Sequence, residues 1–302
     1  ALFITFNFLI ALIIKKSFFV RDFSFISFRK KIEKNFGIIF FSLVIIFVIL
    51  TLFANNGGEI NSEGEKIEIK VAAIQPNIHE TWEWRQEHYE LIADKAFNLT
   101  KQAVNEGAEI VVWPEYTIAV DFIQYREKFR NKVFKFAKEN KVNLVIGTML
   151  YDSQSGDHLD VALYINSFGE IIGRYDSISP ASFNQNTFEA EEQKLISFNL
   201  RSNKLNVGTA ICYEEFFGNI FSDAKKKDSN LFVVLSNNKD VGRGIYLASL
   251  YAKFRAAENN VPLIRSANNG ISQIIAPNGR IIQELSKNQE GIIFSRISVS
   301  TD

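Results

Sequence analysis

The stretch Val207-Gly208-Thr209-Ala210-Ile211-Cys212-Tyr213-Glu214 decides the fold, because an apolar run in it ends abruptly in polar and aromatic residues. We interpret it as a buried strand that delivers one thiol to a turn, where a nucleophile has rigid support behind it and substrate in front. Cys212 is the only cysteine of the chain, so an intrachain disulfide is impossible and a cysteine-based metal site is not expected. The alternative for this thiol is ordinary core packing, since free cysteine is often buried.

Around this strand, segments of strand length alternate with segments of helix length. We expect strands at residues 67–74, 110–113, 143–148, 161–166, 171–175, 206–212, 231–235, 262–266, 272–276 and 291–297. We expect helices at residues 84–106, 125–140, 217–227 and 245–260. Strands separated by such helices predict one α/β domain, residues 67–302, with a mixed and largely buried sheet. A polar linker at residues 55–66 precedes it.

The residues before the linker, 1–54, have the composition of a membrane segment. Residues 37–53 contain no charged side chain, and this length is close to the roughly 17–25 residues that cross hydrocarbon, so we predict a transmembrane helix there. A signal peptide is the alternative. Residues 1–14 are apolar but short for a span, and residues 15–36 form a basic loop that lies either against anionic headgroups or in solvent. Because positive charge stays cytoplasmic, we expect the domain on the periplasmic side of a bacterial inner membrane.

Charge and motif content exclude several other functions. The net charge is zero and the domain has no basic stripe, which argues against nucleic acid as a partner. The three histidines are scattered, no metal-ligand spacing occurs, and no glycine loop is placed to cradle phosphate. We therefore expect neither a metal nor a cofactor.

Four segments then carry a family resemblance by their order along the chain. They are Val71-Ala72-Ala73-Ile74-Gln75-Pro76-Asn77, Val111-Val112-Trp113-Pro114-Glu115, the cysteine strand, and a tail of Ala256-Ala257-Glu258-Asn259-Asn260-Val261-Pro262 with Asn268-Asn269-Gly270-Ile271-Ser272. Over about residues 69–298 this order resembles the nitrilase (carbon-nitrogen hydrolase) superfamily. The apolar run before the domain, the Trp-Pro-Glu form and the Cys-Tyr-Glu form resemble its apolipoprotein N-acyltransferase family.

The resemblance implies a four-layer αββα sandwich and a membrane enzyme. Such an enzyme moves a phospholipid acyl chain through a cysteine thioester to the N-terminal amine of a lipoprotein. Cys212 matches the nucleophile and Glu115 the general base, with a surface carboxylate as the alternative for Glu115. Glu214 matches a supporting acid, and a helix-capping role is the alternative.

The chain departs from the family pattern at the catalytic lysine. Ser177 stands at that position, and a serine cannot supply the positive charge that stabilises an oxyanion. Lys239 is our hypothetical substitute; Lys194 is a weaker one because it is expected to begin a strand. Asp160 also fills a position that the family usually gives to asparagine.

Three functions follow from these observations. The first is an active lipoprotein N-acyltransferase with an altered site, and the second is a weakened or inactive relative that binds lipid or lipoprotein. The third is a membrane-tethered carbon-nitrogen hydrolase of the amidase type. An acyltransferase needs apolar residues at the mouth of its site. Our candidates, for which core packing is the alternative, are Phe122, Phe183, Phe188, Phe216, Phe217 and Tyr246. Family members have further spans, so the chain is expected to be trimmed or to have lost them.

Overall fold

The computed structural model describes residues 65–79, 86–123, 127–151, 158–178, 194–237 and 244–301, together with Ser42 and Ile45. The six ranges belong to one compact unit, residues 63–302. Apart from two helical residues, the predicted membrane segment 1–54 lies outside the described residues, as do Phe183, Phe188 and Lys239. Within the described part, no helix combines the length and the apolar character that crossing a membrane requires.

The first sheet surrounds the short strand that leads to Glu115. Its described strands run in the order β13-β1-β2-β4-β5-β6, with β3 beside β4. The bounds are β1 Lys66–Gln75, β2 Ile110–Val112, β3 Ile118–Asp121, β4 Asn143–Tyr151, β5 His158–Ile165, β6 Ile171–Asp176 and β13 Gly291–Ser300. The centre, β1, β2 and β4, is parallel, and β13, β5 and β6 add to it antiparallel.

The second sheet is built in the same way around the cysteine strand. Its described strands run in the order β12-β11-β10-β9-β8-β7. The bounds are β7 Ile196–Leu200, β8 Asn203–Ile211, β9 Leu231–Ser236, β10 Leu263–Ala267, β11 Ser272–Ile275 and β12 Ile281–Leu285. Strands β8, β9 and β10 are parallel, and the outer strands are antiparallel.

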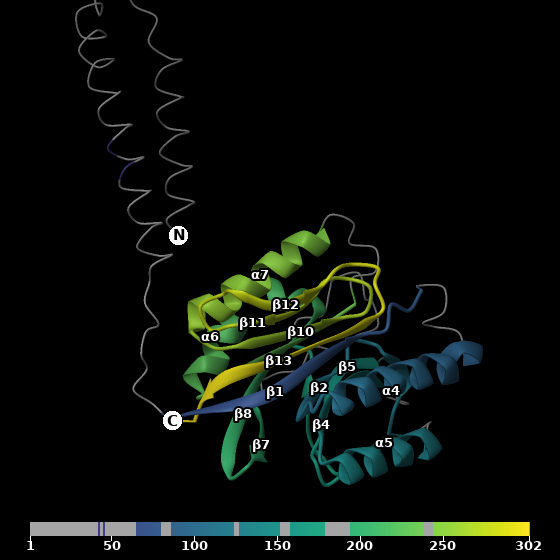
Figure 1. The fold of residues 1–302 in the computed structure, drawn as a ribbon. Helices are drawn as coiled ribbons and strands as arrows, with labels where there is room; N and C mark the ends of the chain where they lie inside the picture. Colours follow the sequence, from purple (N-terminus) through teal and green to yellow (C-terminus); the bar gives the residue numbers. More distant parts are fainter. Residues whose placement is uncertain are drawn as a thin grey trace, which may run out of the picture. The chain divides into compact units, whose positions relative to one another are not determined.

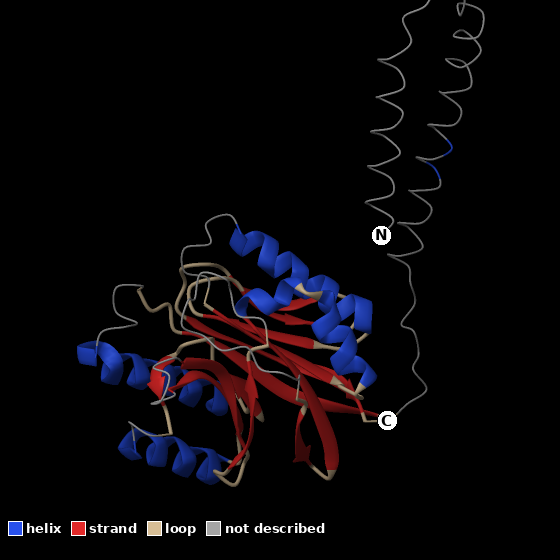
Figure 2. Cartoon of the chain, turned by 180° about the vertical axis from the view of Figure 1, so that it is seen from behind, coloured by secondary structure: helices blue, strands red, loops and turns tan. Residues whose placement is uncertain are grey.

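Each sheet has helices on one face and the other sheet on its opposite face (Figures 1 and 2). Helices α4 (Tyr89–Asn105) and α5 (Glu127–Asn140) pack on the first sheet, and α6 (Gly218–Lys226) and α7 (Gly244–Asn259) pack on the second. Side chains from the inner faces, such as Tyr164, Val207 and Val233, form the core between the sheets. The predicted mixed α/β sandwich is thus confirmed, and its central parallel strands β2 and β9 are almost entirely apolar because both of their faces are covered.

Candidate active site

Four strands of the two sheets bring polar residues to one place. Glu115 follows β2 within three residues, and Cys212, Asn237 and Asn268 directly follow β8, β9 and β10. Asn237 joins the group: its backbone N–H donates to Glu115 Oε2 at 2.7 Å, and its carbonyl lies 4.0 Å from Cys212 Sγ. Asn268 Nδ2 lies 3.5 Å from Asn237 Oδ1. The carboxyl ends of parallel strands therefore form the candidate site, as they do in other α/β proteins.

Cys212 stands on a sharp turn between strand and helix. Its φ is +51°, in the left-handed region that non-glycine residues seldom adopt. It opens a short 3₁₀ helix, η2 (Cys212–Phe216), directly after β8. Backbone strain of this kind persists only where the surroundings fix the turn firmly. The strained backbone therefore indicates that the position of the thiol is functionally important.

The side chains of Cys212 and Glu115 are in hydrogen-bond contact. Burial raises the pKa of the Cys212 thiol well above its usual value, and the charge and hydrogen bond of Glu115 raise it further, followed by the charges of Glu215 and Asp160. The carboxylate is thus placed to take the thiol proton. The resting thiol, however, is strongly protonated, because ionising it would add another negative charge to an acidic site.

A second carboxyl group, Asp160 on β5, touches Glu115. Burial raises the pKa of Asp160 well above its usual range, and the charge of Glu115 and a hydrogen bond between the two side chains add to this. Two carboxyl groups form such a bond only when they share a proton. Asp160 Oδ1 is buried and meets no donor among the described residues. Glu115 and Asp160, which we call the front pair, therefore titrate together.

Glu214 is buried behind the thiol and accepts four hydrogen bonds. The Tyr175 and Ser177 hydroxyls donate to it at 2.9 Å each, and the Ile178 and Ile211 backbone N–H groups donate at 2.7 Å each. Its bond from Ile211 caps η2, so the capping alternative describes what this side chain does. Ser177, for which the family resemblance implied a lysine, donates a hydrogen bond to this carboxylate and is buried.

Arginines secure the rest of η2. Arg265 reaches Glu215 with two nitrogens, at 2.7 and 2.8 Å, and both side chains are buried. Arg255 donates to the carbonyls of Glu215 and Phe216 at 3.2 and 3.3 Å. We call Glu214, Glu215, Arg255 and Arg265 the η2 cradle. Its arginines and Glu215 were not predicted from the sequence, although an arginine inside the apolar strand Leu263–Ala267 was a usable signal.

The loop that carries Glu115 depends on a glycine in β4. A Cβ atom at Gly147 would lie 2.1 Å from the Pro114 carbonyl oxygen and 2.7 Å from Glu115 Cα. Only a residue without a side chain allows the two backbones to approach this closely. Gly147 therefore sets the position of the candidate base.

The proposed lipid-contact residues differ in how far they are exposed to solvent. Phe122 is fully buried and packs edge-on against Phe129 and Phe134, so its assignment to the mouth of the site is wrong: it belongs to the core under α5. Phe216 and Phe217 are half-buried, and Tyr246 is exposed.

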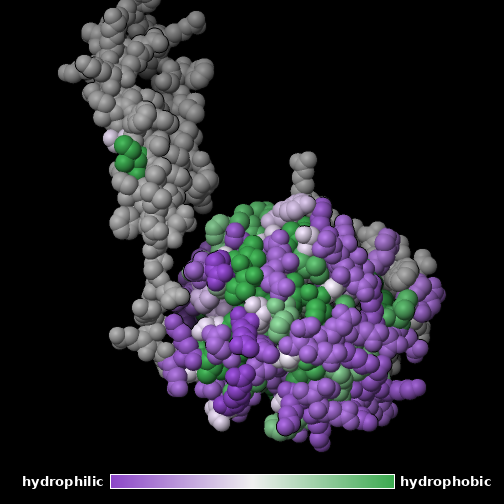
Figure 3. Space-filling model, in the orientation of Figure 1, coloured by the Kyte–Doolittle hydropathy of each residue, from purple (hydrophilic) through white to green (hydrophobic). Residues whose placement is uncertain are grey.

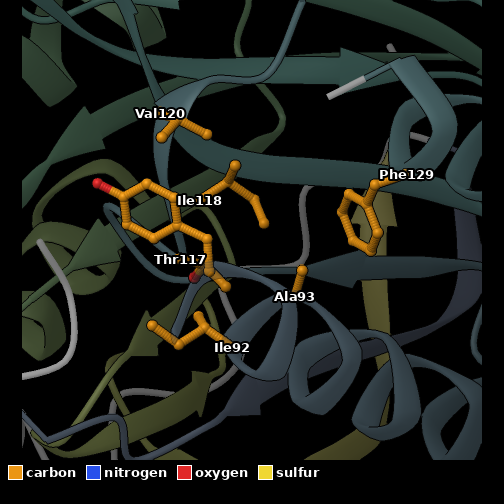
Figure 4. Close-up of a pocket in the computed structure, with 7 residues that line it drawn as sticks. Ile92, Ala93, Thr117, Ile118, Val120 and Phe129 are labelled. Atoms are coloured by element: carbon orange, nitrogen blue, oxygen red, sulfur yellow. The ribbon is translucent and has the colours of Figure 1, made fainter. Parts of the chain in front are cut away.

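Two further features of the chain lie apart from these contacts. Lys194 is exposed, two residues before β7. A small pocket near α4 and β3, lined by residues such as Ile92, Thr117 and Phe129, includes neither Cys212 nor Glu115 (Figure 4).

Comparisons with known sequences identify the family of this domain. The model of the carbon-nitrogen hydrolase family matches residues 70–301. The apolipoprotein N-acyltransferase of Geobacter metallireducens is 29% identical over 232 residues, which is 70% of this chain and 44% of the relative. That of Rickettsia prowazekii is 26% identical over 262 residues, 78% of this chain and 51% of the relative. The chain thus spans about half the length of these curated relatives.

Solved structures share the fold. An amidase from Nesterenkonia sp. superposes with a TM-score of 0.60 at 17% identity, over 76% of this chain and 89% of the amidase. A branch 10 nitrilase superfamily member from Saccharomyces cerevisiae superposes with a TM-score of 0.63 at 19% identity, over 76% of this chain and 89% of that chain. At such identities the likeness concerns the architecture alone.

Proposed function

Because the chain belongs to the carbon-nitrogen hydrolase family, we propose that it is a membrane-bound N-acyltransferase. It moves a phospholipid acyl chain through a thioester on Cys212 to the N-terminal amine of a lipoprotein. The observation that carries this proposal is the hydrogen-bond contact between the Cys212 thiol and Glu115, at the carboxyl edge of both sheets. The curated relatives, which are apolipoprotein N-acyltransferases, support the substrate class.

In the first half-reaction, Glu115 removes the proton from Cys212 Sγ. The thiolate attacks the ester carbonyl carbon of the phospholipid, and a C–S bond forms. The C–O bond to the glycerol oxygen then breaks, and that oxygen takes the proton from Glu115. The products are a lysophospholipid and the acylated cysteine.

In the second half-reaction, the neutral amine of the acceptor attacks the thioester carbonyl. Glu115 accepts a proton from the nitrogen, the C–S bond breaks, and the sulfur takes the proton back. The amide product leaves and the site returns to its starting state. One carboxyl group therefore serves as base and acid in turn.

The oxyanion of each tetrahedral intermediate needs a group that stabilises its negative charge. Ser177 cannot supply this group, because its hydroxyl already donates to Glu214. We propose Lys239, three positions after the end of β9 in the sequence, for this role. Loss of one such donor lowers the rate about 100- to 1,000-fold. Replacement of Lys239 by Met should therefore slow acylation of Cys212 by this factor, whereas Lys194→Met should leave it unchanged because Lys194 is exposed before β7.

We place the protein in a bacterial inner membrane, with residues 37–53 as a span and the domain on the periplasmic side. The charge asymmetry of the sequence supports this orientation. Protease accessibility of the domain in intact spheroplasts tests it: cleavage without lysis is expected, and protection until lysis contradicts the orientation.

The catalytic proposal is tested by trapping the intermediate. Full-length protein in detergent is incubated with phospholipid labelled in its acyl chain, and the Cys212 peptide is examined for a hydroxylamine-sensitive adduct. We expect the adduct in the wild type and its loss in Cys212→Ser. Absence of an adduct in the wild type, with an active relative as positive control, contradicts acyl transfer.

A second function is favoured by the raised pKa of the thiol and by Ser177: a lipid- or lipoprotein-binding relative without turnover. It predicts no adduct, retained binding of lipoprotein, and recovery of the adduct in Ser177→Lys. Release of ammonia from small amides by the wild type, with no lipid adduct, would instead indicate a hydrolase of the amidase type.

A further inference from the structure

Helix α7 presents large apolar side chains to the outside. Tyr246 is 53% exposed, Leu247 49%, Leu250 41% and Phe254 49%. Ala257, one turn further, is also exposed. We call these five residues the α7 outer face. A soluble monomer seldom exposes such a group of apolar residues without a function for it.

These residues share one side of the helix. At 3.6 residues per turn they fall within an arc of roughly 100°. The opposite side of α7 is also apolar, and Ile245, Ala248, Ala252 and Ala256 pack into the domain. A helix that is apolar on both sides is typical of a fully covered helix or of a membrane environment. Figure 3 shows apolar surface in the upper part of the domain, where Figure 1 draws α7.

The α7 outer face continues to the nucleophile through aromatic rings. The ring of Phe254 lies 6.3 Å from that of Tyr251, which lies 5.1 Å from Phe216. Phe216 lies 5.5 Å from Tyr213, which is 43% exposed and directly follows Cys212. The apolar surface thus runs from the helix to the catalytic turn.

Two lysines border this surface. Lys287 Nζ lies 5.0 Å from the centre of the Tyr246 ring, and Lys253 stands at the edge of the apolar arc. Among the described residues, neither lysine forms an ion pair, whereas Arg255 on the buried side is paired with Glu258. Exposed aromatic and leucine side chains beside lysines are the pattern of a helix that lies in a membrane interface.

We propose that the α7 outer face rests in the headgroup region of an anionic phospholipid bilayer and guides acyl chains toward Cys212. This rests on the proposed function and adds the surface through which the donor lipid arrives. A second copy of the chain fits less well, because a twofold contact would bring the lysines of both copies into one interface. The sequence also keeps a bilayer within reach, since the apolar run ends at Phe53 and 12 residues, at most about 40 Å of chain, separate it from β1.

The test uses the full chain with a single introduced cysteine. Cys212→Ser removes the only native cysteine, and Leu250→Cys or the control Leu91→Cys then accepts one bimane label. Leu91 is a matched control because it is 54% exposed on α4, which packs on the other sheet. The protein is reconstituted in nanodiscs of phosphatidylcholine and phosphatidylglycerol, with or without doxyl-labelled lipid.

We expect doxyl lipid to lower the emission at position 250 about twofold, since interfacial helices lie about 5–10 Å deep. Iodide in the water should quench the label at position 91 instead. Efficient iodide quenching at position 250 overturns the proposal. Protection from both quenchers also overturns it, and excimer emission from pyrene labels at position 250 would then identify a second copy as the occupant.

A separate measurement distinguishes this proposal from the catalytic one. The Cys212 adduct is assayed on the unlabelled wild type, which does not depend on the labelling sites. An adduct without lipid quenching at position 250 overturns the α7 surface alone. Lipid quenching without an adduct supports the surface and contradicts acyl transfer.

Discussion

Two groups of buried acids surround Cys212, and they differ in how their charge is balanced. In the η2 cradle, Glu214 accepts four hydrogen bonds and Glu215 is paired with Arg265. In the front pair, Glu115 and Asp160 contact each other, and burial together with the charge of Glu115 raises the pKa of Asp160. A buried carboxylate whose charge is compensated by hydrogen bonds or an arginine stabilises the fold, because any change at it leaves a donor or a charge unsatisfied. A carboxyl group that shares a proton is able to exchange it, which is what acyl transfer requires.

The largest effect on catalysis is expected at Glu115, in the front pair. In Glu115→Gln, the rate of Cys212 acylation should fall about 10²- to 10⁴-fold, because the amide cannot take the thiol proton. The free energy of unfolding should not fall, since the side-chain oxygen that accepts the Asn237 N–H is retained. Single-turnover acylation and urea unfolding measure the two effects, and an unchanged acylation rate would contradict the role of Glu115.

The cradle should respond in the opposite way. In Arg265→Met, the buried charge of Glu215 loses its partner, and breaking such a pair costs about 3–5 kcal/mol of stability. Urea unfolding measures the loss. The double variant Arg265→Met with Glu215→Leu removes both charges and should recover part of the stability. If the single variant is as stable as the wild type, the pair does not hold the turn.

Gly147 tests whether the position of the front pair matters, because a side chain at this residue would displace Glu115 through the backbone. In Gly147→Ala, the new methyl group overlaps the Pro114 carbonyl, and such overpacking costs about 1–3 kcal/mol. The displaced Glu115 should also slow acylation of Cys212. Gly173→Ala is the matched control on β6, since its methyl group would meet only side-chain atoms of Ile196 and no backbone. Equal acylation rates in the two variants would contradict the positioning role.

The smallest effect concerns pH. A raised pKa means that the folded state holds the Asp160 proton more tightly, so its stabilising contribution is complete below the ordinary carboxyl pKa of about 4. This contribution is lost as pH rises through the higher pKa of the folded protein. Asp160→Asn should therefore lessen the fall in melting temperature above pH 4. Identical pH profiles of the two proteins would show that the front pair shares no proton.

The layers of the fold could be predicted because long apolar strands and helices alternate along the chain. Strand β9 is apolar at nearly every position, as expected for a strand covered on both faces. Strands β3 and β12 were not predicted, since β3 is short and β12 is half exposed with mixed polarity. Their positions depend on pairing with neighbours that are distant in sequence.

The site was predictable in part. The motifs around Cys212 and Glu115 indicated these two residues, and the structure places their side chains in contact. Arg255 and Asn237 are brought to the turn from a helix and from another strand, so no local pattern revealed them. Phe122 was predicted at the mouth of the site but is buried. The local sequence around an aromatic residue does not show whether it faces the core or the solvent.

The left-handed backbone of Cys212 restricts which nucleophiles could ever occupy this turn. A β-branched residue is a genuine outlier at a φ of +51°, because its second γ atom crowds the neighbouring peptide groups. Threonine is thereby disfavoured, and serine is the remaining small side chain with a nucleophilic oxygen. Of the residues with a hydroxyl or thiol on Cβ, the turn therefore admits only cysteine and serine without added backbone strain.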